Sequence, residues 1–243
     1  MTNGIKTHEA NINLVEKFLD YANCADAAYA LLEYIKKNAE YENEDKADNL
    51  TFGNKLEQDI QIKDNNGELL YTKPKGTNTA YACAIQARFQ KDKIINQSLC
   101  FPYTNTCLNN ETINNDITKI KLDDKLSQRT INFVNRFKML YHQPNTDSGF
   151  SATLFEDTQD SNQKILAIRG TEISNDIKND ALDADMDLIT GKVPNNQYID
   201  MLLFHQSCIK QGYITQSTTL IITGHSLGGY LAQRFCPIIC YNQ

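Results

Sequence analysis

Residues 218–235 read Thr-Thr-Leu-Ile-Ile-Thr-Gly-His-Ser-Leu-Gly-Gly-Tyr-Leu-Ala-Gln-Arg-Phe, and this stretch decides the fold. The apolar, β-branched residues 218–223 predict a strand, and the residues that follow the glycines predict a helix. A sharp turn between the two would push Ser226 outward. Gly224 and Gly228 would let the strand and the helix pass without side-chain collisions. The stretch therefore predicts an α/β arrangement with a serine at the end of a strand.

The turn fits the G-x-S-x-G pattern of a hydrolase nucleophile, with Ser226 as the attacking residue. The helix after it aims free amides at the serine, so the Leu227 N–H would receive a developing oxyanion, helped by the helix dipole. The alternative is a glycine-rich turn that only packs tightly or holds a phosphate. A phosphate loop would need a lysine after the glycines, where Tyr230 stands. His225 is not expected to act as a base, because successive side chains in such a turn point apart and its ring would not easily reach the Ser226 hydroxyl.

A second short motif, Arg169-Gly170-Thr171, ends an apolar strand predicted at residues 164–168. On residues alone this motif could be an ordinary strand-end turn. Together, this motif and the later Gly-His-Ser-Leu-Gly-Gly-Tyr-Leu-Ala run resemble the class 3 (fungal-type) lipase family of α/β hydrolases. The resemblance covers residues 149–233. It implies that Ser226 is the nucleophile, that Thr171 supplies a second oxyanion-hole donor, that the substrate is a lipid or other ester, and that no metal or organic cofactor is needed.

The residues after the serine lack the acid and the base that its chemistry requires. In α/β hydrolases these follow the nucleophile in the order Asp or Glu, then His, yet residues 227–243 contain none of the three. His8, His142 and His205 all lie upstream. We expect His205 to be a partly exposed helix residue and His142 to stand near a helix end, so neither is expected to be the base.

Two hypotheses follow. In the first, the chain is a serine ester hydrolase truncated after the elbow, with impaired activity. In the second, it is a non-catalytic or decayed hydrolase-fold protein that acts, if at all, as a binding module. Either would leave an unpaired, apolar sheet edge that a partner could cover.

The predicted fold is an incomplete, mostly parallel α/β-hydrolase sheet with covering helices at residues 123–243. An N-terminal helical region with a β-hairpin precedes it at residues 1–122. Apolar periodicity and turn residues predict these elements. The helices are expected at residues 13–37, 79–93, 123–141 and 198–211, and the strands at 59–63, 68–71, 149–155, 164–168 and 218–223, with a loop at 96–118.

Composition narrows the possible partners and compartments. The chain has 243 residues, a net charge of −6 and a pI near 5.3, which argue against a nucleic-acid partner. It starts without the apolar run of a secretory signal, and no stretch approaches the ~18 apolar residues of a membrane span. We expect a cytoplasmic protein, with secretion by a signal-less route left open. Seven scattered cysteines predict reduced thiols.

One acidic segment looks briefly like a calcium loop. Asp183, Asp185 and Asp187 alternate as in the opening of such a loop, but Leu188 stands where glycine is required and Pro194 where a bidentate glutamate is required. A solvated acidic surface is therefore expected here, and no metal site is predicted.

Overall fold

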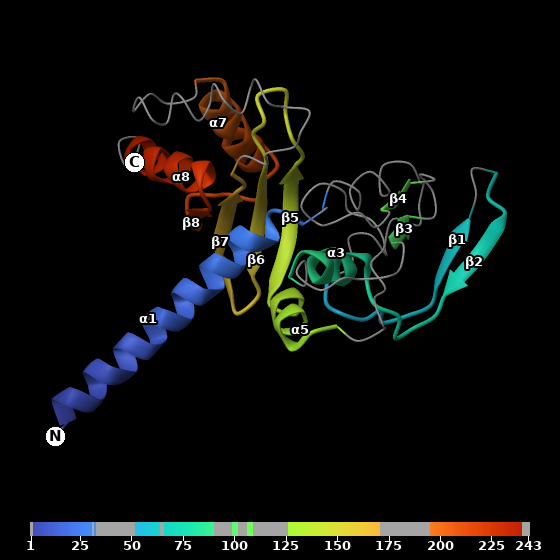
Figure 1. Ribbon diagram of the computed structural model, residues 1–243, viewed down its shortest axis with the longest axis horizontal. Coiled ribbons are helices and arrows are strands. Elements are labelled where there is room, and N and C mark those ends of the chain that lie inside the picture. Colours follow the sequence, from blue (N-terminus) through green and yellow to red (C-terminus); the bar gives the residue numbers. More distant parts are fainter. Residues whose placement is uncertain are drawn as a thin grey trace.

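The computed structural model describes residues 2–30, 32, 52–63, 66–89, 99–101, 106–108, 126–170 and 195–239 (Figure 1). The elements are α1 (Thr2–Ala27), β1 (Ile60–Lys63), β2 (Leu69–Lys73), α3 (Ala80–Phe89), β3 (Leu99–Phe101), β4 (Thr106–Leu108), α5 (Gln128–Val134), β5 (Phe137–Gln143), β6 (Ala152–Asp157), β7 (Asp160–Ile168), α7 (Asn195–Lys210), β8 (Thr219–Gly224) and α8 (Leu227–Ile239).

The main sheet has four strands in the order β5-β6-β7-β8. Strand β6 runs antiparallel to both β5 and β7, and only β7 and β8 are parallel. The prediction of a mostly parallel sheet was therefore wrong. Short connections join β5 to β6 and β6 to β7, and short connections allow only antiparallel pairing. The chain between β7 and β8 is long enough to include α7, which permits the one parallel pair.

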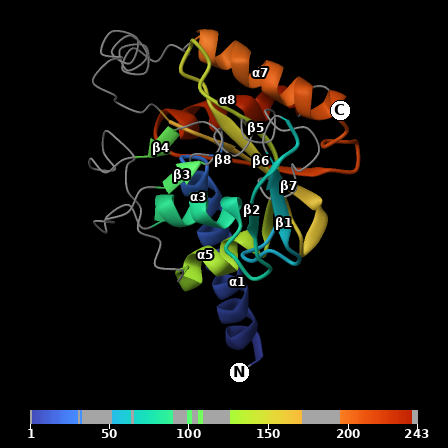
Figure 2. The same ribbon diagram turned by 90° about the vertical axis from the view of Figure 1, so that its right-hand side faces the viewer.

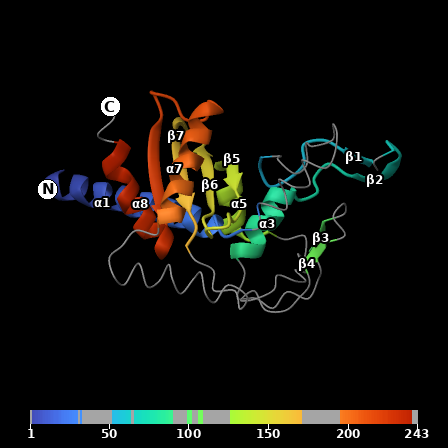
Figure 3. The same cartoon turned by 90° about the horizontal axis from the view of Figure 1, so that it is seen from above.

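The two faces of the sheet bury separate groups of apolar side chains, as the alternation along β7 shows. Ile165 and Ala167 belong to a core shared with α1, α3 and α5. Leu166 and Ile168 belong to a core shared with α7 and α8. Because side chains alternate along a strand, one apolar run serves both faces. The result is a helix–sheet–helix sandwich, and Figure 3 shows β5, β6 and β7 side by side within it.

The N-terminal helices join the sheet through one of these cores. Tyr81 of α3 donates its hydroxyl proton to the Phe137 carbonyl at 2.5 Å. Asp26 of α1 accepts from Arg88 of α3 at 2.7 Å and from Arg129 of α5 at 2.8 Å. This core includes residues from both sides of the boundary predicted at residues 122 and 123.

Helix α1 differs from the expected helix at residues 13–37 in its bounds and in its burial. It begins at Thr2 and ends at Ala27. The apolar side chains of its middle section were expected to pack, yet four of them are between 52% and 66% exposed. They are Leu14, Val15, Phe18 and Leu19. Figure 2 shows the N-terminal part of α1 extending away from the body of the molecule, so only its last turns reach the core.

The helix predicted at residues 123–141 was wrong in its second half. Helix α5 ends at Val134 with Asn135 as its C-cap, and the chain continues as β5. Apolar residues at Phe137 and Leu140 fit a helical period equally well. These residues form a strand because they pair with β6, from Phe137 opposite Asp157 to Gln143 opposite Ala152. Local propensity is a weak preference that such pairing overrides.

The remaining predicted elements fall close to their expected positions. The structure confirms the hairpin around Asn66 and Gly67. It also confirms, with shifted ends, the predicted strands and helices that match α3, β6, β7, α7 and β8. The loop predicted at residues 96–118 was wrong in part, because it contains the short antiparallel pair of β3 and β4. No helix among the described residues combines the length and the apolar character needed to cross a membrane.

A buried carboxylate anchors the β6–β7 turn. Asp157 is 3% exposed and accepts from Nε and Nη2 of Arg136 at 3.1 and 2.9 Å. Its hydrogen bond raises the pKa of Arg136.

We expect Asp157→Asn to lower the free energy of unfolding by about 2 kcal/mol, because an amide nitrogen would face the guanidinium. Urea unfolding measures this. Asp160→Asn is the matched control, because an amide oxygen still accepts from the Asn162 N–H. Equal stability of the two variants would contradict the prediction.

Candidate active site

Ser226 stands at a strained turn between β8 and α8. Strand β8 ends at Gly224, helix α8 begins at Leu227, and the serine between them has φ = 55°. It is the only non-glycine residue among the described ones with a positive φ. L-residues rarely adopt this backbone conformation, and it is the strained geometry of a nucleophile elbow. The serine is exposed, so the predicted strand, turn and helix present it at the surface.

Two glycines are required by close backbone contacts at this turn. A Cβ at Gly224 would lie 2.4 Å from the Gly228 carbonyl carbon. A Cβ at Gly228 would lie 2.3 Å from the Ile168 carbonyl oxygen, on the neighbouring strand β7. Backbone atoms cannot rotate out of the way as side chains do. Both positions therefore exclude any side chain, as the sequence predicted.

The start of α8 offers an amide to a ligand beside Ser226. Within the turn, the Gly228 N–H donates to His225 O at 3.0 Å, and the Gly229 N–H donates to Ser226 O at 2.9 Å. The Leu227 N–H belongs to the first turn of α8, whose amides have no acceptor inside the helix and carry the positive end of its dipole. The Leu227 side chain is 2% exposed and anchors the turn. The backbone amide is thus the group that Leu227 can present.

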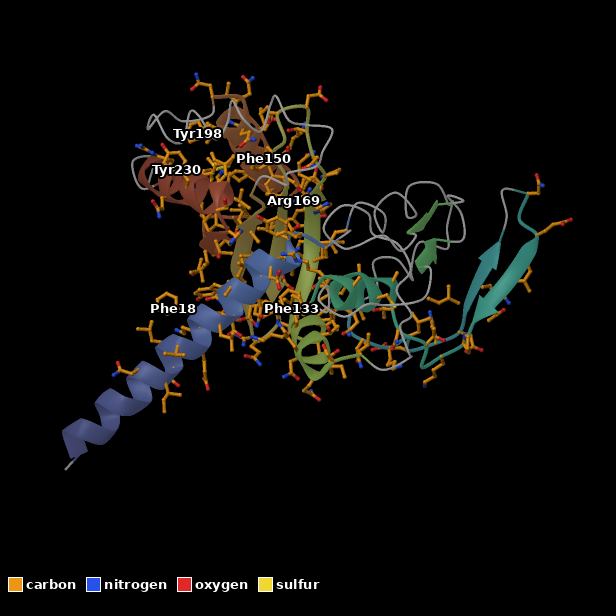
Figure 4. The ribbon with its side chains drawn as sticks, in the orientation of Figure 1. Phe18, Phe133, Phe150, Arg169, Tyr198 and Tyr230 are labelled. Atoms are coloured by element: carbon orange, nitrogen blue, oxygen red, sulfur yellow. The ribbon has the colours of Figure 1, made fainter. Side chains whose placement is uncertain are left out.

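The end of β7 lies against the elbow. Parallel pairing sets Ile168 opposite Gly224, so Arg169 and Gly170 continue beside the turn, and Figure 4 labels Arg169 close to the end of its strand. A Cβ at Gly170 would lie 2.5 Å from His225 O and 3.2 Å from Ser226 Cβ. The structure therefore brings together the two motifs found in the sequence. Thr171 lies outside the described residues, so its oxyanion role stays a prediction.

His225 is directed towards helix α1. Its Nδ1 lies 3.4 Å from the Tyr29 hydroxyl, and the two rings meet edge to face with centroids 6.2 Å apart. Neither contact involves Ser226, and a packing role, as the resemblance implies for this position, stays a prediction for this exposed side chain.

The remaining histidines lie elsewhere in the fold. His142 is buried on β5, not near a helix end as predicted, and its Nδ1 lies 2.9 Å from Thr153 Oγ1. His205 lies in α7 against the ring of Phe235, and burial lowers its pKa. The side chain of His8 is outside the described part. In that part, no side chain forms a hydrogen bond with the Ser226 hydroxyl, so the structure does not supply the acid and the base.

Two buried cysteines do not rival Ser226 as nucleophiles. Burial raises the pKa of Cys208 to about 12 and raises that of Cys24 well above its usual value. The nucleophilic form of cysteine is the thiolate, which neither would form near neutral pH. The acidic residues 183–187 lie outside the described part of the chain.

A pocket of about 600 Å³ adjoins the elbow between α1 and β8. It is lined on the helix by Phe18, Ala22 and Ala25, and it reaches Ile222 and His225 on the strand side. No motif in the sequence predicts such a pocket. The only hint of a pocket in the sequence is the pair of small residues Ala22 and Ala25 on one face of α1. Small residues at this spacing predict close helix packing as readily as a cavity.

Tyr29, just beyond the end of α1, is the second feature that sequence reasoning missed. Its hydroxyl oxygen accepts a hydrogen bond from the Gly170 N–H at 2.8 Å. The two residues are 141 positions apart, and no short motif connects them.

The resemblance to class 3 lipases rests on the residues of the two motifs, because this chain matches none of the family models, curated proteins or solved structures with which it was compared.

Proposed function

We propose that this chain is a serine hydrolase of carboxylic esters, similar to class 3 lipases, with Ser226 as its nucleophile. The observation that carries the proposal is the positive φ of an exposed Ser226 between a strand and a helix, with Gly170 held against the turn. A turn that only needed tight packing would have no reason to place a non-glycine residue in this strained conformation.

The proposed reaction proceeds through an acyl-enzyme. Ser226 Oγ attacks the ester carbonyl carbon, the new C–Oγ bond forms, and the negative charge collects on the carbonyl oxygen. The Leu227 N–H, with Thr171 as predicted second donor, stabilises that charge. The ester C–O bond then breaks, and the alcohol leaves with the serine proton. Water then attacks the acyl carbon, the acyl C–Oγ bond breaks, the carboxylic acid leaves, and one proton of the water returns to Ser226 Oγ.

The missing base limits the rate of this reaction. A serine without a general base is a weak nucleophile. Loss of triad function costs up to ~10⁶ in turnover and leaves ~10³–10⁴ over water from binding and the oxyanion hole. Impaired activity is therefore part of the proposal.

The substrate class is proposed to be a lipid ester. The pocket between α1 and β8 supports this, because Phe18, Ala22, Ala25 and Ile222 give it an apolar wall beside the charged Asp26 and Arg88, and it reaches His225, next to the nucleophile. Burying a methylene group contributes about 0.8 kcal/mol, so the apolar wall favours substrates with an apolar acyl chain, and the charged side suits a polar part of the same molecule.

A non-catalytic binding role is the second candidate. It is favoured by the lack of any side chain hydrogen-bonded to Ser226 within the described residues. Among the described strands, β8 pairs only with β7, so its other edge is open to a strand of a partner. In this role the hydrolase scaffold would bind without turnover.

A fluorophosphonate probe separates the two functions. We expect the folded chain to be labelled, with the added mass on the peptide that carries Ser226 when the product is digested and mapped by mass spectrometry. A heat-denatured sample is the control, because labelling that survives unfolding reflects general reactivity. A folded sample that stays unlabelled at long exposure would favour the binding role.

A further inference from the structure

Tyr29 contacts both halves of the candidate active site. Its hydroxyl oxygen accepts from the Gly170 N–H at 2.8 Å, at the end of β7, and lies 3.4 Å from His225 Nδ1, in the elbow. An oxygen that accepts the amide proton keeps its own proton to donate, and Nδ1 is an acceptor in one neutral tautomer of histidine. One hydroxyl therefore links the two segments that must stay in register for the site to work.

The ring of Tyr29 is itself held in place. The Arg88 guanidinium lies over it, 4.5 Å from its centroid, and Arg88 is fixed by Asp26 at 2.7 Å. The guanidinium of Arg169 lies 5.7 Å from the same ring. Cations over an aromatic face are attracted to it. These contacts leave the hydroxyl a defined position, so it can act as a fixed point rather than as a mobile surface group.

Gly170 is the residue whose position this hydroxyl controls. A Cβ added there would meet the Tyr29 hydroxyl at 2.8 Å, His225 O at 2.5 Å and Ser226 Cβ at 3.2 Å, so the three groups converge on Gly170. Thr171, the predicted second oxyanion donor, follows it directly in the sequence. A displacement of about 1 Å can reduce a rate about 100-fold. A small shift of Gly170 would therefore affect the reaction.

We propose that Tyr29 is a positioning residue: its hydroxyl fixes the backbone of Gly170 against the elbow and orients the imidazole of His225. This rests on the proposed function for its effect on rate, and on the two contacts alone for its effect on structure. It assigns to the turn that follows α1 a task at the site that neither sequence motif contains.

Tyr29→Phe tests the proposal, because phenylalanine keeps the ring under Arg88 and removes only the hydroxyl. We expect the maximal rate of fluorophosphonate labelling at Ser226 to fall about tenfold, with the half-saturating probe concentration unchanged, since the probe still binds but meets a displaced donor. We also expect the Gly170 amide to exchange its proton at least tenfold faster, and the ¹⁵N signal of His225 Nδ1 to move. Tyr198→Phe, on the other face of the sheet, is the matched control.

The three measurements separate the possible failures. Unchanged Gly170 exchange and an unchanged His225 signal, equal to those of the Tyr198→Phe protein, would overturn the positioning role. A chain that is never labelled in any variant would overturn the proposed function, while the exchange and ¹⁵N measurements would still decide the role of Tyr29.

Discussion

Replacing Ser226 by alanine is expected to abolish covalent labelling by a fluorophosphonate completely. The probe forms a bond to the serine oxygen, and alanine offers no atom for that bond. The φ of 55° at position 226 is equally unfavourable for serine and for alanine. The replacement therefore adds no backbone strain, and the fold should tolerate it. Labelling followed by mass spectrometry and a thermal unfolding curve, recorded on the same sample, measure both effects.

The same variant also reports whether a base acts on Ser226. In a complete triad, removing the serine alone costs about as much turnover as removing all three members, roughly 10⁶-fold. If the base is absent, most of that rate is already lost, and Ser226→Ala should change ester turnover far less than it changes labelling. A large loss of turnover would mean that a base reaches Ser226 from residues outside those described.

Ser207→Ala is the control for the loss of a hydroxyl. Ser207 lies in α7, where its hydroxyl donates to the Leu203 carbonyl at 2.9 Å, away from the elbow. Its replacement should leave labelling unchanged. Labelling that persists in Ser226→Ala would show that another residue reacts, and would remove the reason for naming Ser226 the nucleophile.

The elbow could be predicted from the sequence because its geometry is local. The glycines at positions 224 and 228 and the serine between them lie within five residues, and the contact that requires Gly224 is made with Gly228 itself. Only the contact that requires Gly228 comes from a distant residue, Ile168 on the neighbouring strand β7. The close contacts of both glycines agree with that prediction.

The direction of the strands could not be predicted as safely, because it depends on the length of the connections between strands more than on the residues within each strand. The apolar residues of β7 look the same in a parallel and in an antiparallel sheet. The links between β5 and β6 and between β6 and β7 are short enough only for antiparallel pairs. Only the connection through α7 is long enough for a parallel pair.

The role of Tyr29 illustrates a further limit. In the sequence it lies within the helix predicted at residues 13–37, and no motif distinguishes it from its neighbours. Its hydroxyl gains a function only when α1 is laid beside the ends of β7 and β8, far away in the chain.

Gly228→Ala is expected to destabilise the protein by about 3 kcal/mol, at the upper end of the cost of overpacking a tight interior. The added methyl carbon would stand 2.3 Å from the carbonyl oxygen of Ile168 and 2.9 Å from the Arg169 carbonyl carbon. Relief of this overlap requires α8 to move away from β7, which would also carry the elbow, with Ser226 and the Leu227 amide, away from Gly170. Against a total stability of about 5–15 kcal/mol for a typical domain, this is a large fraction. Urea unfolding measures the loss, and fluorophosphonate labelling should fall with it.

Gly229→Ala makes the effect of crowding separable from the effect of losing a glycine. Gly229 is the next residue in the first turn of α8, and a Cβ there would lie 3.1 Å from Gly224 O, with its next contact at 3.7 Å. Alanine favours a helix over glycine by about 1 kcal/mol at either position, so that gain is common to both variants. Their difference therefore isolates the contact between α8 and β7. Equal unfolding midpoints for Gly228→Ala and Gly229→Ala would mean that the helix does not cross the strand this closely. The placement of the end of β7 against the elbow would then lose its structural basis.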